Sequence, residues 1–347
     1  MTVYADSEGS PSKGVRALGL AGASLICLLM GGAATITLLG SGTQNASVRI
    51  PLTPAASRAA EQAVIQAQPT PDTPMPPVTQ VQHAGRALIA DPALTENTAL
   101  GPLPRVADDG RKPMTAYAGP AAGGKLRIAI VVTGLGLSAK ATQAALAGLP
   151  PAVTVGLLPY ASDAPRWLSA ARAKGHEVVL QVPMEPFDFP DSDPGPHTLR
   201  TGVTSANAER LNWAMTRFTG YAGVANLLGD RFLSDSEALA PVLTNLSRRG
   251  LYFYDTGSTL RSVVPTVAGA LGAPFAQGAS NLDTIQTALE IDRRLTELED
   301  RARANGSAVG TAFVYPVSVE RIAVWAKGLQ SRGFVLVPVS AIVNQPK

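Results

Sequence analysis

The last two thirds of the chain alternate short apolar runs with segments of helical periodicity, and this alternation constrains the fold most. Each run is rich in β-branched residues and has the length of a buried strand. The strand-like runs are 126–132, 153–158, 177–182, 221–226, 251–255, 307–314 and 334–339, and the helical segments are 139–148, 162–174, 205–217, 235–249, 284–304 and 318–331. Such alternation predicts an α/β fold with a mainly parallel sheet, either a (β/α) barrel or a doubly wound sheet.

The N-terminal region has a different character. Residues 17–40 form a run of 24 residues without a charge, which is long enough to cross a hydrocarbon core of roughly 30 Å. Lys13 and Arg16 precede it and no Lys or Arg follows until Arg49, so residues 1–16 are expected in the cytoplasm and the remainder across the inner membrane. We predict a transmembrane anchor; a cleaved signal peptide is the alternative, although its apolar region is usually only about 7–15 residues long.

A proline-rich stretch separates this run from the alternating region. Residues 41–124 contain twelve prolines and no sustained periodicity. The segment PTPDTPMPP (69–77) favours extended polyproline geometry. We predict a disordered periplasmic linker over 41–124 that tethers a folded domain spanning 125–347. A ligand for a proline-binding partner is the alternative interpretation.

Composition excludes several classes of protein. Cys27 is the only cysteine, so no disulfide framework or cysteine-ligated zinc site can form within the chain. The formal net charge is +3 over 347 residues, and the cations are scattered. A nucleic-acid-binding domain would carry a dense basic face. We therefore expect no nucleic-acid partner.

Ligands of parallel α/β folds bind at the carboxyl ends of the strands, so the residues after each run are the candidate site. The first run ends in TGLG (133–136), which resembles a dinucleotide-binding turn. The acidic residue expected about 20 positions later and a P-loop lysine are both missing. Nucleotide binding is therefore disfavoured.

A long loop with several carboxylates follows the third strand-like run. Glu185 lies nearest the strand end, which makes it a candidate catalytic residue. Asp188, Asp191 and Asp193 lie further along the loop, without the spacing of an EF-hand calcium loop. We interpret these three as a solvated acidic lid.

Other strand ends supply further polar candidates. Asp255 closes its run directly, where a catalytic or binding carboxylate would lie, with capping of the next turn as the alternative. Asn226, Asp230, Arg231 and Tyr315 follow two other runs and are candidate ligand-binding residues.

Other patterns favour structural roles or exclude chemistry. We interpret Asp283 as the N-cap of the helical segment 284–304. The histidines show no metal-ligand spacing, and no G-x-S-x-G nucleophile elbow is present.

Five segments together resemble a known family. In order they are IAIVVTGLG (128–136), GHEVVLQVPMEP (175–186), GVANLLGDRF (223–232), LYFYDTGS (251–258) and GSAVGTAFVYPVS (306–318). They look like the divergent polysaccharide deacetylases over residues 125–343. The resemblance implies a distorted (β/α)7 barrel in the bacterial envelope. Active members remove acetyl groups from glycans, using an aspartate base and a divalent metal such as zinc that activates water.

The resemblance also assigns positions to the metal ligands of active members. An Asp pair of the family falls on Thr133 and Gly134. Its histidine positions are occupied here by Gln181, Leu227, Phe313 and Tyr315. Asp255 keeps its type, and Glu185 keeps its place in the PMEP segment. The resemblance therefore implies the scaffold with few of its metal ligands, because leucine and phenylalanine cannot bind such an ion.

Together these observations predict a membrane-anchored periplasmic barrel of glycan metabolism or recognition, without a cofactor and without the usual metal mechanism. Asp255 and Glu185 are its candidate catalytic residues. The candidate ligand-binding residues are Thr133, Gln181, Asn226, Asp230, Arg231 and Tyr315. Two alternatives remain: a hydrolase with a reorganised carboxylate site, and a non-enzymatic scaffold that docks another envelope protein.

Overall fold

A computed structural model describes residues 90–344 of the chain. The predicted anchor at 17–40, the residues before it and the linker up to residue 89 lie outside this range. Within the described part, no helix is both long and apolar enough to span a bilayer. The folded domain occupies this part.

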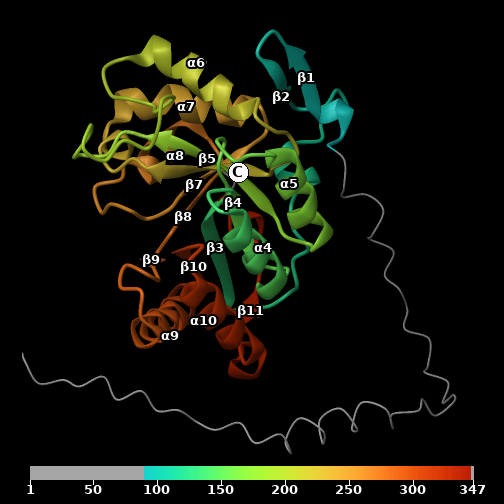
Figure 1. Ribbon diagram of the computed structural model, residues 1–347, viewed down its shortest axis with the longest axis vertical. Helices are drawn as coiled ribbons and strands as arrows, with labels where there is room; N and C mark the ends of the chain where they lie inside the picture. Colours follow the sequence, from blue (N-terminus) through green and yellow to red (C-terminus); the bar gives the residue numbers. More distant parts are fainter. Residues whose placement is uncertain (1–89, 345–347) are drawn as a thin grey trace, which may run out of the picture. The chain divides into compact units, whose positions relative to one another are not determined.

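A parallel sheet of nine strands forms the centre of the domain (Figure 1). Its order is β8-β7-β6-β5-β4-β3-β10-β9, and β11 pairs with the amino half of β3. The strands are β3 Arg127–Leu135, β4 Thr154–Leu157, β5 Val178–Met184, β6 Gly223–Leu228, β7 Tyr252–Asp255, β8 Phe275–Gln277, β9 Ser280–Asn281, β10 Ser307–Phe313 and β11 Val335–Leu336.

The two ends of this sheet meet in the chain between β8 and β9. Gly278 N donates to the carbonyl of Asp255 on β7 at 2.7 Å, and Ala279 N donates to the carbonyl of Val309 on β10 at 2.8 Å. The sheet therefore curves round on itself, and the prediction of a (β/α) barrel is confirmed at the level of an α/β barrel of parallel strands.

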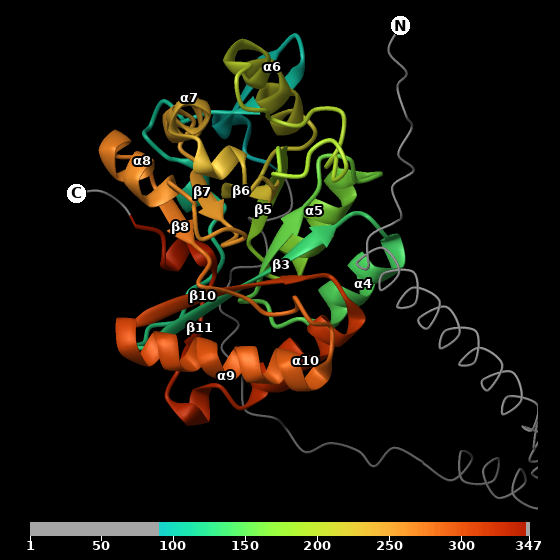
Figure 2. The same cartoon turned by 90° about the vertical axis from the view of Figure 1, so that its left-hand side faces the viewer.

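Seven helices of eight residues or more cover the outside of this sheet in the described residues (Figure 2). They are α4 Ala139–Gly148, α5 Ala164–Ala173, α6 Thr204–Met215, α7 Ser236–Arg248, α8 Val264–Leu271, α9 Ala288–Asn305 and α10 Pro316–Lys327. The short α8, β8 and β9 were not predicted, because segments of two to eight residues carry little periodicity.

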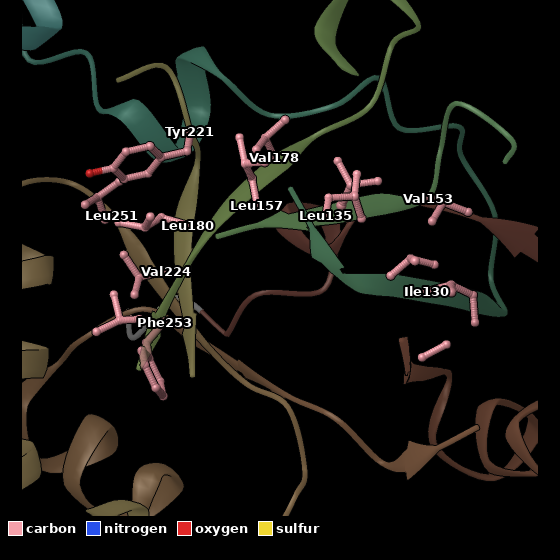
Figure 3. Packing of buried hydrophobic residues seen from close by; sticks show 14 of the residues in the cluster. Ile130, Leu135, Val153, Leu157, Val178, Leu180, Tyr221, Val224, Leu251 and Phe253 are labelled. Carbon is pink, nitrogen blue, oxygen red and sulfur yellow. The ribbon is translucent and has the colours of Figure 1, made fainter. Parts of the chain in front are cut away.

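Side chains alternate between two hydrophobic clusters along each strand, as the pleat requires. On β7, Phe253 joins the outer cluster that packs against the helices (Figure 3), whereas Tyr252 and Tyr254 join an inner cluster that holds no side chain from α4–α10. The inner cluster also includes Val131 of β3 and Val179 of β5. It therefore marks the interior of the barrel.

The predicted linker is wrong over its last part. Residues 90–124 contain η1 Pro92–Leu94, the hairpin β1 Thr95–Thr98 and β2 Gly101–Pro104, and α3 Pro113–Ala116. Leu94, Leu103, Met114 and Tyr117 are buried in the domain. The prolines misled the prediction because Pro92 and Pro113 stand at helix starts, where proline is favoured.

The N-cap prediction for Asp283 is also wrong. Helix α9 begins at Ala288, and the hydroxyl of its N-cap Thr287 accepts from Glu290 N. Asp283 is buried instead and accepts from Phe313 N and Ser318 Oγ, both at 2.7 Å. It thus joins β10 to α10, and burial raises the pKa of its carboxyl group.

A buried carboxylate closes the amino end of the barrel. Glu177 accepts hydrogen bonds from Tyr252 OH at 2.8 Å, Ser340 N at 3.1 Å, Thr154 Oγ1 at 3.2 Å and Gly119 N at 3.0 Å. These donors come from two strands and from segments near both ends of the domain. Glu177 therefore links distant parts of the chain where the strands begin.

Candidate functional site

The carboxyl ends of the parallel strands lie at one end of the barrel, which we call the mouth. Alternation from the inner cluster places Thr133, Gln181 and Phe313 on the interior side of β3, β5 and β10. Thr133 and Phe313 are direct partners in the register of β3 and β10. Three of the positions assigned from the family resemblance therefore converge at the mouth.

Gly134 occupies the position that the resemblance assigns to the second aspartate of the family. Its N–H donates to Gln181 Oε1 at 2.6 Å, and its φ of +84° is a conformation that L side chains rarely adopt. A Cβ at this position would collide with the ring of Phe313. The aromatic ring therefore occupies the space next to Gly134 into which a side chain there would project.

The neighbouring positions are used in packing. Thr133 Oγ1 donates to the carbonyl of Ala312 at 3.0 Å and is almost fully buried. The rings of Phe313 and Tyr315 lie 4.8 Å apart between centroids. Tyr315 is half-buried at the start of α10. These residues make the β3–β10 side of the mouth largely apolar.

Asp255 is fully buried and holds the turn that follows β7. Its Oδ1 accepts from Gly257 N at 2.9 Å, and its Oδ2 accepts from Gln277 Nε2 at 3.0 Å. Both carboxylate oxygens are thus engaged by the protein. This geometry matches the capping role that the sequence left open as the alternative to a catalytic one.

Asn226 holds the adjacent loop in a similar way. Its Oδ1 accepts from Thr256 N at 2.9 Å, and its Nδ2 donates to Thr256 Oγ1 at 2.9 Å and to Leu228 O at 2.6 Å. Leu228 has a φ of +55°, which is uncommon for a residue with a side chain. The Asn226 amide therefore fixes a strained turn at the end of β6.

The inner side of the same region carries a hydroxyl network. Tyr254 OH lies 2.6 Å from Thr311 Oγ1, which donates to the carbonyl of Thr256 at 2.8 Å. Burial raises the pKa of the Tyr254 hydroxyl, so it remains protonated. These contacts join β7 to β10, and neither hydroxyl was singled out from the sequence.

Glu185 belongs to a separate cluster at the end of β5. Its Oε2 accepts from Thr201 N at 2.6 Å and from Thr201 Oγ1 at 3.0 Å, and its Oε1 lies 3.3 Å from Arg231 Nη1. The carboxylate is buried, whereas half of the Arg231 side chain is exposed. Asp230 is only partly buried. Of the predicted ligand-binding residues, Arg231 and Asp230 are therefore accessible to solvent.

The loop after Glu185 is ordered by its own contacts. Asp188 accepts from Ser192 Oγ, and Asp193 accepts from Gly195 N at 2.8 Å. His197 stacks on Trp213 of α6 with centroids 3.7 Å apart. Partial burial, with lesser effects of two arginines, lowers the pKa of His197. This segment forms a fixed wall beside the mouth.

The side chains at the mouth decide whether it could bind the divalent metal that the resemblance implies. In residues 90–344, no three His, Cys, Asp or Glu side chains group as metal ligands. The assigned positions hold Thr133, Gly134, Gln181, Leu227, Phe313 and Tyr315. A hydroxyl, an amide and a phenol do not fit a zinc ion, which binds imidazole, thiolate and carboxylate groups.

The profile of the divergent polysaccharide deacetylases matches residues 130–343. This match spans most of the described barrel. The chain belongs to the divergent polysaccharide deacetylase family. The resemblance of the five strand-end segments is thereby confirmed, and the family match covers every position of the mouth discussed above.

Relatives of this deacetylase-family chain include proteins of three bacteria. The uncharacterized protein YibQ of Escherichia coli K12 is 27% identical over 235 residues, covering 67% of this chain and 72% of YibQ. An uncharacterized protein of Haemophilus influenzae is 25% identical over 206 residues, covering 59% and 71%. The crystal structure of the uncharacterized protein ATU2773 from Agrobacterium tumefaciens has 43% identity and a TM-score of 0.68, covering 70% of this chain and 99% of that one.

Proposed function

We propose that this member of the deacetylase family binds an envelope glycan at the mouth of its barrel and does not perform metal-dependent deacetylation. The observation that carries the proposal is the exchange at Gly134 and Phe313. A glycine with a positive φ stands where the family has an aspartate, and an aromatic ring occupies the adjacent space. Restoring a ligand there would require changes at two strands, so the metal site is lost in geometry as well as in residue type.

Exposed groups around the mouth support retained ligand binding. The rings of Tyr160 and Phe187 are partly exposed after β4 and β5, and Arg231 and Asp230 offer polar groups after β6. A ligand site that combines flat apolar surfaces with a few polar groups is typical of recognition clefts. An aromatic face is suited to the apolar face of a sugar ring.

The reorganised hydrolase is less well supported. A general base must reach its proton within hydrogen-bond distance. Asp255 is fully buried with both oxygens engaged, and Glu185 is held by Thr201 and Arg231. We expect Asp255→Asn and Glu185→Gln to alter stability while leaving any turnover unaffected.

The test uses the full chain purified with and without chelator. We expect binding of chitooligosaccharides or peptidoglycan strands that persists in chelator, no stoichiometric divalent metal by elemental analysis, and no released acetate. Stoichiometric metal together with acetate release would contradict the proposal. If no glycan binds and the chain instead retains a defined envelope protein, the scaffold alternative replaces it.

We further propose that the domain acts in the periplasm, held to the inner membrane by residues 17–40. The uncharged run and the placement of Lys13 and Arg16 support this location. Membrane fractionation of the native chain and protease protection in spheroplasts test it. A soluble, N-terminally processed product would indicate the cleaved signal peptide instead.

A further inference from the structure

The hairpin β1–β2, α6 and α7 lie together on one side of the domain (Figure 1), and a groove of about 1090 Å³ lies between them. One face of α7 supplies most of its lining. The lining residues are Glu96, Arg105, Val106, Ala208, Glu237, Ala240, Pro241, Thr244, Asn245, Arg248 and Arg249. None of the residues discussed at the mouth belongs to this described set. The groove is therefore a second candidate binding site.

Two charged side chains of the groove have no charged partner. Arg105 and Arg249 each pair with a carboxylate at 2.6 Å. Glu237 and Arg248 are exposed, and within residues 90–344 neither forms an ion pair. Positions 237 and 248 lie on the same face of α7, about 16 Å apart along its axis. The groove thus carries a free negative charge near the start of α7 and a free positive charge near its end.

Between these two charges, α7 offers hydrogen-bonding groups that suit a polypeptide backbone. Pro241 lies inside the helix and has no N–H, so the carbonyl of Glu237 lacks the donor that a helix normally provides four residues later. Asn245 Oδ1 accepts from Arg249 Nε at 3.0 Å, whereas its Nδ2 has no acceptor among the described residues. An acceptor and a donor are therefore available to the N–H and C=O groups of an extended peptide.

A small pocket extends the groove between α6 and α7. It shares Ala208, Pro241 and Asn245 with the groove, and its other lining residues include Leu211 and Val242. Its volume of about 40 Å³ admits a group of roughly methyl size. No aromatic ring of the described residues lines either space. Because sugar rings pack well on aromatic faces, the groove suits a peptide better than a glycan.

We propose that this groove binds an extended peptide segment of a partner protein. An acidic residue of the segment pairs with Arg248, a basic residue pairs with Glu237, and a small apolar side chain enters the pocket between α6 and α7. An extended chain advances about 3.3 Å per residue, so the two charged residues are about five positions apart. Charge complementarity sets the direction of the segment along α7. The site is independent of glycan binding at the mouth.

Fluorescence polarisation on the full chain tests this with labelled octapeptides of alanine and serine that carry one glutamate and one lysine. The two charges are placed one to seven positions apart, and doubly acidic and doubly basic octapeptides are the controls. We expect the tightest binding at a separation of about four to six positions, at least about tenfold tighter than at one position or with like charges. This binding should weaken as salt increases.

Substitutions assign the binding to the two ends of the groove. Glu237→Gln and Arg248→Gln should each weaken the best peptide about fivefold, the strength of an exposed ion pair. Arg248→Glu should invert the specificity, so that a doubly basic peptide binds more tightly than the mixed one. Ala208→Trp, at an exposed position of α6, should fill the groove and abolish binding. Glu320→Gln and Arg301→Gln, exposed on α10 and α9, are the matched controls.

Each outcome supports or overturns the proposal. If no octapeptide binds, peptide binding itself is overturned, whatever the result with glycans. If binding is equal at every separation, or if Arg248→Glu does not favour the doubly basic peptide, the assignment to Glu237 and Arg248 is overturned. Binding that survives Ala208→Trp would place the peptide elsewhere on the domain. Urea unfolding of each variant checks that the fold is retained.

Discussion

The two ends of the barrel differ in how much apolar surface they expose to solvent. At the amino end, the buried Glu177 joins strands to segments near both ends of the domain. At the mouth, loops expose large apolar side chains. Of the eleven such side chains in residues 90–344, eight lie at or beyond strand carboxyl ends: Leu137, Tyr160, Phe187, Val203, Leu228, Leu260, Ile285 and Leu289. The amino end thus serves stability, and the mouth has the character of an interaction surface.

Removing Glu177 would break the amino end and has the largest expected effect. Glu177→Ala leaves the buried hydroxyls of Tyr252 and Thr154 and the half-buried N–H groups of Ser340 and Gly119 without this acceptor. Because each unsatisfied buried group costs about 1–3 kcal/mol, we expect the free energy of unfolding to fall by at least about 3 kcal/mol. Urea denaturation measures it.

Glu177→Gln is the matched control for this loss. It keeps one carbonyl oxygen as an acceptor, so it should lose less stability than Glu177→Ala. A loss below about 1 kcal/mol in Glu177→Ala would show that the amino end does not depend on this carboxylate.

An aspartate at position 134, where the resemblance places one in the family, tests the packing of the mouth. Gly134→Asp must accept a φ of +84° and overlap with the Phe313 ring. We expect a loss of about 2–6 kcal/mol in unfolding free energy, since backbone strain and overpacking each cost about 1–3 kcal/mol. Thermal and urea unfolding measure the loss.

Gly110→Asp separates the two contributions. Gly110 has a φ of +83°, but apart from Gly110 itself and its two chain neighbours no atom of the described residues lies within 4 Å of the position that a Cβ would take there, so this variant reports the backbone strain alone. Measured against Phe313→Ala alone, Gly134→Asp should cost only the backbone strain, because the overlap with the ring is then absent. Equal losses at Gly134 and Gly110 would mean that the Phe313 ring moves aside freely.

The pH dependence of the unfolding free energy also tests the difference between the two ends of the barrel. Each end holds one histidine with a lowered pKa, His176 at the amino end and His197 beside the mouth. His176 is buried before β5, its Nδ1–H donates to Val153 O at 2.9 Å, and burial lowers its pKa. The unfolded chain therefore binds the proton more tightly. The stability that His176 contributes is complete above about pH 6.5 and is lost as the pH falls towards the lower pKa of the folded state.

We expect the unfolding free energy of the native chain to fall with decreasing pH below about 6.5, by at most about 1.4 kcal/mol per pH unit from this residue. His176→Gln should flatten that slope. His197→Gln should flatten it less, because His197 is more exposed on the wall of the mouth. An identical slope in His176→Gln would show that other groups carry the acid sensitivity.

The sequence predicted the repeating architecture better than the site. The seven strand-like runs correspond to β3, β4, β5, β6, β7, β10 and β11, because buried parallel strands have a local signature. The contact between Phe313 and Gly134 depends on cross-strand register between residues far apart in the chain. Burial of Met114 likewise depends on tertiary packing, which a proline count cannot reveal.

Residue type alone also did not always identify which of two nearby residues takes a given structural role. Both Asp283 and Thr287 have the residue type of an N-cap, and the backbone turns into α9 after the second. Asp255 was correctly placed at a strand end, but its engagement by Gln277 required β8, which was not predicted. Glu185 likewise acquires its partner Thr201 through a loop closure that no short motif encodes.

The smallest expected effect concerns the exposed leucines of the mouth. Leu260 and Leu289 are largely in solvent, whereas Leu295 lies less than two turns beyond Leu289 on α9 and is fully buried. Leu260→Ser and Leu289→Ser should change the unfolding free energy by less than about 0.5 kcal/mol, and Leu295→Ala should lower it by about 2–5 kcal/mol. A loss above about 1 kcal/mol at either exposed leucine, growing with protein concentration, would show that a second copy covers the mouth, because only association makes stability depend on concentration.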